Sequence, residues 1–268
     1  MLSTSATRHP LVVPIELVSY IGKKHLQTAI QTVLDAPLHP DRPLAFAVLR
    51  VPFFLEPQYD ETKPFIETNR ERLLTKWGAQ WPRQKQTHNL KGRGIEAGIP
   101  HFNLDRLASN TMSSHRLIQY LGKTYGLDVS EAIYDVLNVY YFVDGHSLND
   151  HPRVAQVVAD ALSDLFAKRA MSAPTTQNLL DFLSSQQGRK EIQAATAALQ
   201  QLGIHSIPKF IIEGQTVVDG AALPDVFVQV FREIEERGTV VGGPLFRKIL
   251  GVSTETIARA SHHRHCDV

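Results

Sequence analysis

Cysteine is nearly absent from this sequence: among its 268 residues, Cys266 is the only one. A disulfide joins two thiols, so no intramolecular disulfide can form within these residues. Proteins of oxidising compartments often rely on such bonds, whereas cytosolic proteins do without them. We therefore expect a protein of the reducing cytoplasm.

An excess of charge and a long apolar run are also missing. Lysine and arginine number 28 and aspartate and glutamate number 27, which gives a formal net charge of +1. Nucleic-acid-binding and membrane-surface proteins usually carry a clear basic excess, and a membrane-spanning helix needs about 20 consecutive apolar residues. We therefore expect neither nucleic acid nor membrane among the partners. With 43% hydrophobic residues, the chain has the composition of an ordinary globular protein.

The first part of the chain has a strand–helix–strand pattern. Residues 11–18 are apolar and β-branched but contain Pro14 and Glu16, which favours an irregular strand or a strand at the edge of a sheet. Ser19 is placed to cap a helix, and residues 44–55 are typical of a second strand. The apolar face of the helix is formed by Leu26, Ile30, Val33 and Leu34.

The middle of the chain has a helical pattern, interrupted by loops rich in glycine and proline at residues 78–109. Asn110 and Thr175 are candidate N-caps of two of these helices. Helices inserted between the second and third strands of a small sheet are expected to form a separate domain. The sequence thus predicts an all-helical domain inserted into an α/β domain.

The last part begins with a turn at Gly203 and passes through Pro208 into two short strands, near residues 210–212 and 216–218. A proline directly before a strand removes a hydrogen-bond donor, and a cis bond between Ile207 and Pro208 is one way to accommodate it. An amphipathic helix follows at residues 224–237. We expect this division of the chain: residues 11–62 and 203–238 for the α/β domain, 63–202 for the helical domain and 239–268 for a C-terminal tail.

Several motifs, taken in order, resemble one protein family. The motifs are Tyr20-Ile21-Gly22-Lys23-Lys24-His25-Leu26, Arg50-Val51-Pro52-Phe53-Phe54-Leu55, Asn110-Thr111, Ser114-His115-Arg116-Leu117-Ile118, Tyr140-Tyr141-Phe142-x-x-Gly145 and the Ile207-Pro208 loop. With these motifs the chain is similar to the DsbA-like thioredoxin family, and in particular to its FrnE branch, which is related to 2-hydroxychromene-2-carboxylate isomerases and kappa-class glutathione transferases. The resemblance covers about residues 11–236 and implies a thioredoxin-like fold with an inserted all-helical domain.

The redox motif of this family is missing. FrnE-like proteins carry Cys-Pro-x-Cys directly before Tyr-Ile-Gly, and here that place reads Glu16-Leu17-Val18-Ser19. Thiol–disulfide exchange proceeds by thiolate attack and a mixed disulfide, so it cannot run without those sulfurs. The family resemblance implies an oxidoreductase, but these residues do not support that activity.

Two polar residues, Glu16 and Ser19, take the place of the motif and are the candidate catalytic residues. The start of a helix favours a nearby anion by about 0.3–1 kcal/mol, which is too little to turn Ser19 into an alkoxide without a base. Ser19 could instead donate a hydrogen bond to a bound thiolate, as the resemblance implies, or simply cap the helix. Glu16 could act as a general acid or base, or lie on the solvent side of an edge strand.

The resemblance also implies a substrate site made of Tyr20, Arg50, His115, Ile207 and Pro208. In this fold the cis-proline loop faces the start of the first helix, and the backbone of Ile207 pairs with an extended ligand such as glutathione. Arg50 could bind an anionic group or form a salt bridge, and His115 could be catalytic or structural. Glutathione is the implied cofactor, although Ala222 and Leu223 stand where relatives place an acidic residue to hold it.

Two functions therefore remain open. The first is a small-molecule enzyme of isomerase or transferase type, with or without glutathione. The second is a non-catalytic scaffold or binding module that forms a homodimer or docks a partner through a short apolar helix at residues 245–250. The histidines and cysteine at residues 262–266 have metal-binding side chains but no ligand spacing, so we expect a solvated terminus and no metal site.

Overall fold

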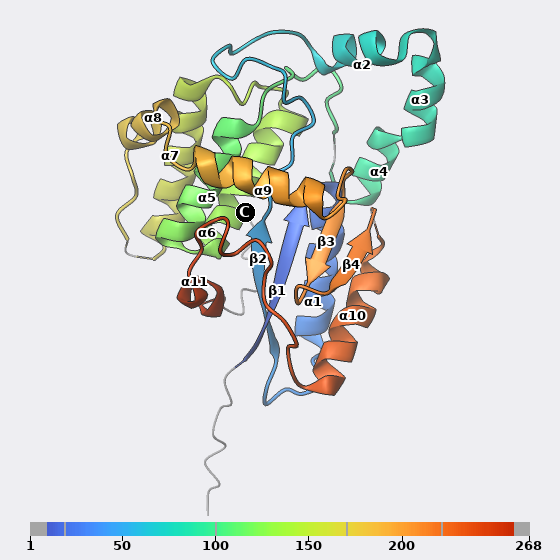
Figure 1. The fold of residues 1–268 in the computed structure, drawn as a ribbon, viewed down its shortest axis with the longest axis vertical. Coiled ribbons are helices and arrows are strands. Elements are labelled where there is room, and N and C mark those ends of the chain that lie inside the picture. Colours follow the sequence, from blue (N-terminus) through green and yellow to red (C-terminus); the bar gives the residue numbers. More distant parts are fainter. Residues whose placement is uncertain (1–9, 19, 100, 170, 221, 260–268) are drawn as a thin grey trace, which may run out of the picture. The chain divides into compact units, whose positions relative to one another are not determined.

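The structure is a computed structural model that describes residues 10–18, 20–99, 101–169, 171–220 and 222–259 (Figure 1). The chain divides into two compact units. The first contains the residues up to Val51 and those from Leu199 onward, and the second runs from Pro52 to Ala198. The sequence placed these borders after residues 62 and 202.

The first unit is built on a four-stranded sheet with the order β2-β1-β3-β4. Strand β1 (Leu11–Val18) pairs in parallel with β2 (Leu44–Arg50) and antiparallel with β3 (Lys209–Ile212). Strand β4 (Thr216–Asp219) completes the sheet, antiparallel to β3. The predicted strand–helix–strand followed by two strands and a helix is therefore confirmed.

Strand β1 lies between two other strands, so the expectation that residues 11–18 form an edge strand was wrong. That expectation rested on Pro14, which has no N–H to donate. Pro14 lies just beyond the ladder with β3, whose register runs from Ile15 to Val18, and its carbonyl oxygen accepts a hydrogen bond from the Glu213 N–H. A proline at the end of a ladder costs a strand little.

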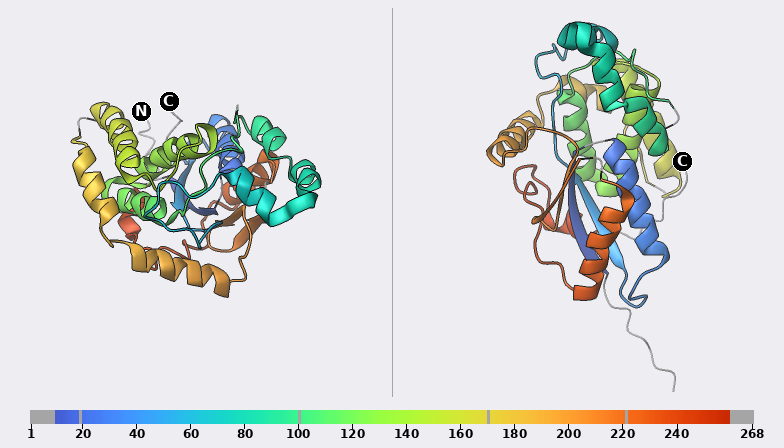
Figure 2. Two further views of the ribbon diagram at one scale, coloured as in Figure 1. Left: turned by 90° about the horizontal axis from the view of Figure 1, so that it is seen from above. Right: turned by 90° about the vertical axis from the view of Figure 1, so that its right-hand side faces the viewer.

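One face of the sheet is covered by α1 (Ile21–Asp35) and α10 (Pro224–Arg237), which pack against each other (Figure 2). Alternate residues of β1 point to this face, because successive side chains of a strand point to opposite sides. The resulting core contains Val13, Ile15, Leu17, Leu26, Ala29, Val33, Leu44, Phe210, Ile212, Val218, Phe227, Phe231 and Ile234.

The segment that follows α10, residues 239–259, packs onto the first unit. It ends in a short helix, α11 (Thr254–Ala258), that contacts β1. Residues 245–250, expected to form a helix, form consecutive turns in which the Leu250 N–H binds the Phe246 carbonyl. Phe246 and Leu250 are buried, so most of the apolar side chains of this segment are already packed within the chain.

The described part of the second unit is mainly helical, with an isolated antiparallel bridge between Thr68 and Leu107. Thr175, an expected N-cap, accepts a hydrogen bond from the backbone N–H of Asn178. Asn110 accepts one from the Met112 N–H, but the N-cap of the helix that begins at Met112 is Thr111, one residue later, which makes no side-chain cap hydrogen bond. Residues 78–109, predicted as loops, contain three short helical segments. The elements are α2 (Asn69–Trp77), the 3-10 helix η1 (Gly78–Gln80), α3 (Trp81–His88), α4 (Leu90–Glu96), α5 (Met112–Tyr125), α6 (Leu127–Asn138), the π-helix η2 (Val139–Val143), α7 (His151–Ala167), α8 (Thr176–Ser184) and α9 (Arg189–Gln201), whose end belongs to the first unit.

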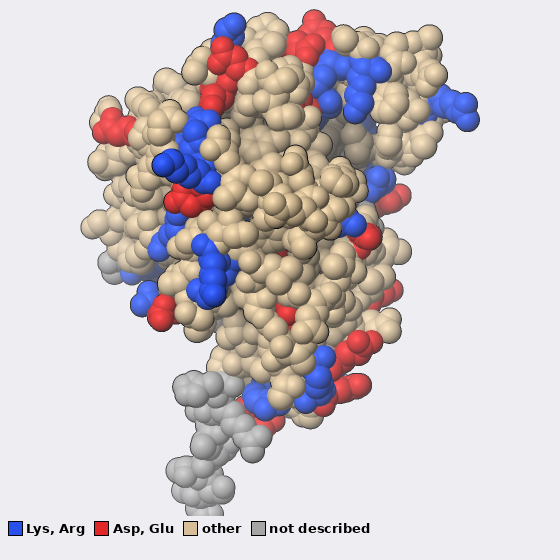
Figure 3. Space-filling view, viewed as in Figure 1, with Lys and Arg blue, Asp and Glu red and all other residues tan. Residues whose placement is uncertain are grey.

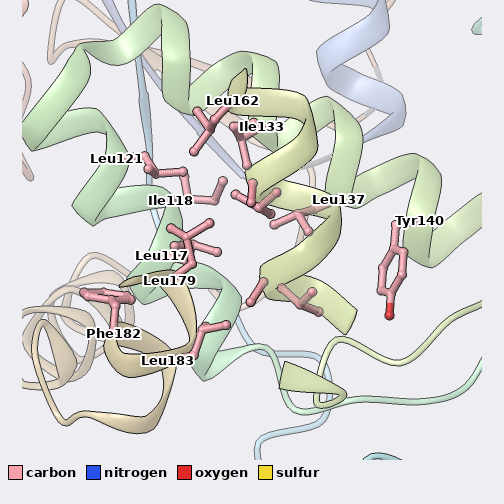
Figure 4. Packing of buried hydrophobic residues seen from close by; sticks show 14 of the residues in the cluster. Leu117, Ile118, Leu121, Ile133, Leu137, Tyr140, Leu162, Leu179, Phe182 and Leu183 are labelled. Atoms are coloured by element: carbon pink, nitrogen blue, oxygen red, sulfur yellow. The ribbon is translucent and has the colours of Figure 1, made fainter. Parts of the chain in front are cut away.

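The second unit has a hydrophobic core of its own, between α5, α6, α7 and α8 (Figure 4). Fully buried residues from all four helices meet there, among them Leu117, Ile133, Leu162 and Leu179. A core of this size is expected to hold the helical unit together independently of the sheet.

Candidate functional site

The proline loop lies at the start of β3. The peptide bond between Ile207 and Pro208 is cis, as the sequence suggested. The carbonyl oxygen of Pro208 accepts a hydrogen bond of 3.0 Å from the Gly220 N–H, which ties the loop to the residue after β4. Lys209, the first residue of β3, pairs with Val18 at the end of β1. The loop is therefore fixed to the sheet on both sides.

The first turn of α1 packs directly against this loop. A Cβ atom added to Gly22 would lie 3.3 Å from the Cβ of Pro208 and 2.6 Å from Cζ of Phe210. Only glycine fits such an approach, because a real Cβ would overlap the Phe210 ring. Farther along α1, Nδ1 of His25 lies 2.9 Å from the carbonyl oxygen of Ala222. The expected apposition of the proline loop and the start of the first helix is thus present.

Arg50 lies at the same end of the sheet. It is the last residue of β2 and pairs with Leu17 of β1, one position before Val18. The carboxyl ends of the parallel strands β1 and β2 therefore coincide with the start of β3, where Pro208 lies. Ligands of α/β proteins commonly bind at the carboxyl ends of parallel strands. Arg50 is only 4% exposed.

The residues around the start of α1 are mostly buried. Tyr20 occupies the N-cap position and is 8% exposed, whereas Ser19, the expected cap, lies outside the described residues. Lys23, in the first turn, is 2% exposed. A lysine at this end of a helix is unfavourable, because the helix dipole is positive there. Nothing in the sequence pointed to Lys23 beyond its place in the Tyr20 motif.

Glu16 points away from this site. It alternates along β1 with Ile15 and Leu17, which face the core under α1, so its side chain lies on the opposite face. There its carboxylate accepts hydrogen bonds from the N–H groups of Phe246, at 2.6 Å, and Leu245, at 3.0 Å. The side chain is only 2% exposed, so the expected position on the solvent side of an edge strand was wrong.

Burial raises the pKa of Glu16 from 4.5 to about 7, and the hydrogen bonds from Phe246 and Leu245 oppose this rise. A second carboxylate, that of Glu213, holds the same segment and is equally buried. It accepts hydrogen bonds from the Val241 N–H at 3.1 Å and from Arg237 at 2.5 Å. We call these two residues the carboxylate anchors of residues 239–259. Glu213 follows the strand after the Ile207-Pro208 loop, but nothing in the sequence indicated that its side chain would bind this segment.

His115 belongs to the second unit. Its Nε2 lies 3.1 Å from the carbonyl oxygen of Phe53, and its ring makes an edge contact with Phe54, with centroids 5.3 Å apart. These contacts tie α5 to the segment that begins this unit. They are sufficient to explain a histidine here by structure.

The described part of the chain shows neither a group of metal-binding side chains nor a membrane-spanning helix. Its histidines and acidic residues form no group of three or more that could hold a metal ion. The histidines and cysteine at residues 262–266 lie outside the described residues. None of the helices within the described ranges is both long and apolar enough to cross a membrane.

The sheet order, the cis-proline before β3 and the inserted helices define a DsbA-like thioredoxin fold. The structure is similar to that of a Streptomyces coelicolor protein named as a probable DsbA oxidoreductase, with a TM-score of 0.62 and 21% identity over 87% of this chain and 93% of that one. A Nitrosomonas europaea protein, named as a candidate protein disulfide isomerase, gives a TM-score of 0.53 and 11% identity over 85% and 99% of the two chains. No family model and no curated protein matches the sequence. At these identities the likeness shows the fold alone.

Proposed function

We propose that this protein is a relative of the FrnE branch that has lost the redox dithiol and binds an anionic small molecule at the proline loop. The reaction that we assign to it is an isomerisation or a group transfer, with glutathione as the candidate cofactor. One observation carries the proposal. The first turn of α1 lies against the loop that contains the cis bond before Pro208. Gly22, in this turn, has no side chain, so the helix backbone directly approaches the Pro208 and Phe210 side chains.

The chemistry of this corner suits an extended, peptide-like anion. The backbone of Ile207 precedes β3 and can pair with such a ligand as a neighbouring strand would. The start of α1 favours a carboxylate or thiolate by about 0.3–1 kcal/mol, and Arg50 at the end of β2 adds a permanent positive charge. Glutathione carries two carboxylates, a thiol and extended peptide bonds, so it matches all three features.

The roles of the other candidates differ. Ser19 keeps its proposed role as a hydrogen-bond donor to the bound thiolate. Tyr20 keeps its proposed place in the substrate site, next to the start of α1. Glu16 is no longer proposed as an acid or base, because both of its carboxylate oxygens bind the backbone at Leu245 and Phe246 on the other face of the sheet.

Calorimetry with glutathione tests this proposal. We expect saturable heat with the wild-type protein and at least a tenfold lower affinity for Arg50→Gln, because a lost charge-assisted hydrogen bond costs about 1.5–3 kcal/mol. Arg42→Gln is the matched control. Arg42 lies just before β2, at the opposite end from Arg50, and donates to the carbonyl oxygen of Gly238. No heat at millimolar glutathione, or equal weakening by both variants, would remove glutathione from the proposal.

A non-catalytic binding module is the second candidate function. It is favoured by the position of Glu16, since one of the two polar replacements at the motif is used to hold the C-terminal segment. A homodimer through residues 245–250 would have to use Leu245, which is half-exposed, because Phe246 and Leu250 are buried. Binding of glutathione without turnover of any electrophilic acceptor would favour this second function. For either function we place the protein in the cytoplasm, since it has a single cysteine.

A further inference from the structure

The positive charge of the chain is concentrated in one part of the helical unit. Residues 69–96, which form α2, η1, α3 and α4 and which we call the basic arm, contain seven lysines and arginines and two glutamates. Their net charge is +5, whereas the rest of the chain carries −4, which together make the total of +1. The near-neutral total therefore conceals a strongly basic segment.

Most of these cations form no close ion pair with a carboxylate in the part of the chain that the structure describes. Arg70 forms an ion pair with Asp105, and Arg72 pairs with Glu56 at 2.9 Å. The other five form no ion pair within the described residues, and four of them are exposed. Lysines and arginines are visible around α2 and α3 in the space-filling view (Figure 3). The unpaired cations are Lys76, Arg83, Lys85, Lys91 and Arg93.

The arm also includes a helix that buries nothing. None of the residues of α3 is buried, and the same holds for η1. A helix in a globular protein is normally stabilised by packing an apolar face, and α3 has no buried face of this kind. Pro82 in its first turn and Asn89 at its end set the limits of α3 locally.

Apolar and aromatic side chains accompany the cations. Trp77 and Trp81 are the only tryptophans of the chain, and both are partly exposed. On α2, Leu74 is 45% exposed and lies three residues before Trp77, and on α4, Ile95 is 65% exposed and lies four residues after Lys91. Residues at these spacings share a helix face. Nζ of Lys76 also lies 5.1 Å from the centre of the Trp77 ring.

We propose that the basic arm binds the surface of an anionic lipid bilayer. Tryptophan is favoured at the level of lipid headgroups, exposed aliphatic side chains enter the acyl boundary, and lysines extend their charge to the headgroups. Single-stranded nucleic acid also attracts cations and aromatic rings. It gives no role to Leu74 and Ile95, however, and this favours the bilayer. The inference is independent of the function proposed for the proline loop.

Tryptophan fluorescence reports on the basic arm alone, because both tryptophans of the chain lie in it. We expect the emission to shift to the blue when the full chain is mixed with vesicles of phosphatidylcholine and phosphatidylglycerol, and to stay unchanged with phosphatidylcholine alone. Added salt should reduce the shift. Unchanged emission with anionic vesicles would overturn the proposal. So would quenching by a single-stranded oligonucleotide in the absence of a vesicle response, which would assign the arm to nucleic acid.

Two double variants distinguish a specific role of the basic arm in membrane binding from an effect of the total charge of the protein. Lys85→Gln with Lys91→Gln removes two exposed cations of the arm, and we expect partitioning to anionic vesicles to fall by about fivefold for each. Lys168→Gln with Lys190→Gln removes the same charge from exposed positions at the end of α7 and on α9. These control residues should leave partitioning unchanged. Equal losses in both double variants would contradict a specific role of the arm.

Discussion

Glu16 places a carboxyl group in the interior of the first unit, where it binds the backbone of a segment about 230 residues later in the chain. Each of its oxygens accepts one N–H, from Leu245 and from Phe246. Burial still dominates its ionisation and raises its pKa to about 7. Glu16 therefore has a structural role, and its carboxyl group gains or loses its proton near neutral pH.

The stability of the protein should therefore depend on pH through Glu16. The folded state binds the proton of Glu16 more tightly than the unfolded chain does, so its contribution is complete below pH 4.5 and is lost as the pH rises to about 7. At about 1.4 kcal/mol per pKa unit, the loss is of order 3 kcal/mol. The unfolding free energy of the wild type should fall relative to that of Glu16→Gln between pH 5 and pH 8, because only the wild type loses this contribution. A difference that does not change with pH would contradict this pKa.

Gly22 is the second residue with a specific role, since it allows α1 to approach Phe210. We expect Gly22→Ala to destabilise the protein by about 1–3 kcal/mol, because the added methyl group overlaps a fully buried ring. Gly243→Ala is the matched control, since a Cβ there meets nothing within 4 Å. Urea unfolding of the two variants measures the difference. Equal stability of both would show that α1 and Phe210 are not in close contact.

At the scale of the elements, the segment after α10 completes the sheet domain. The carboxylate anchors hold it through Val241, Leu245 and Phe246. It supplies buried apolar residues, among them Phe246, Leu250, Val252 and Ile257. Without this segment the face of the sheet that carries Glu16 would lose these contacts, so the segment belongs to the fold of the first unit.

Two neighbouring substitutions test this packing. Phe246→Ala removes a side chain that is 1% exposed and should cost about 3–5 kcal/mol. Leu245→Ala removes one that is 47% exposed and should cost less than about 1 kcal/mol. Thermal unfolding compares them directly. Similar losses in both variants would mean that this segment does not pack as described.

The sequence predicted elements whose signals are local. Thr175 caps α8 in a capping box with Asn178, and the proline at the start of α10 lies at the first helical turn, as the sequence indicated. The central position of β1 was missed, because Pro14 suggests an edge and its partner strand β3 comes about 200 residues later. Pairings at such a separation leave no trace in the local pattern.

At the scale of the whole molecule, the fold could be recognised from motifs, whereas much of the site could not. The proline loop and Arg50 were predicted, since they follow short motifs that the fold brings to one end of the sheet. The use of Glu16 by the C-terminal segment depends on which face of β1 it occupies and on what covers that face, which no motif encodes. The basic arm was hidden for a similar reason, because the total charge averages over the chain.

The central claim is that the proline loop and the start of α1 still form a binding site in a chain without the redox dithiol. The most direct test is to follow the backbone amide resonances during a titration with glutathione. We predict saturable shifts at Ile207 and at Tyr20 to Lys23, with the amides of Leu245 and Phe246 unaffected. Shifts confined to other residues, or no saturable change at any residue, would contradict the claim.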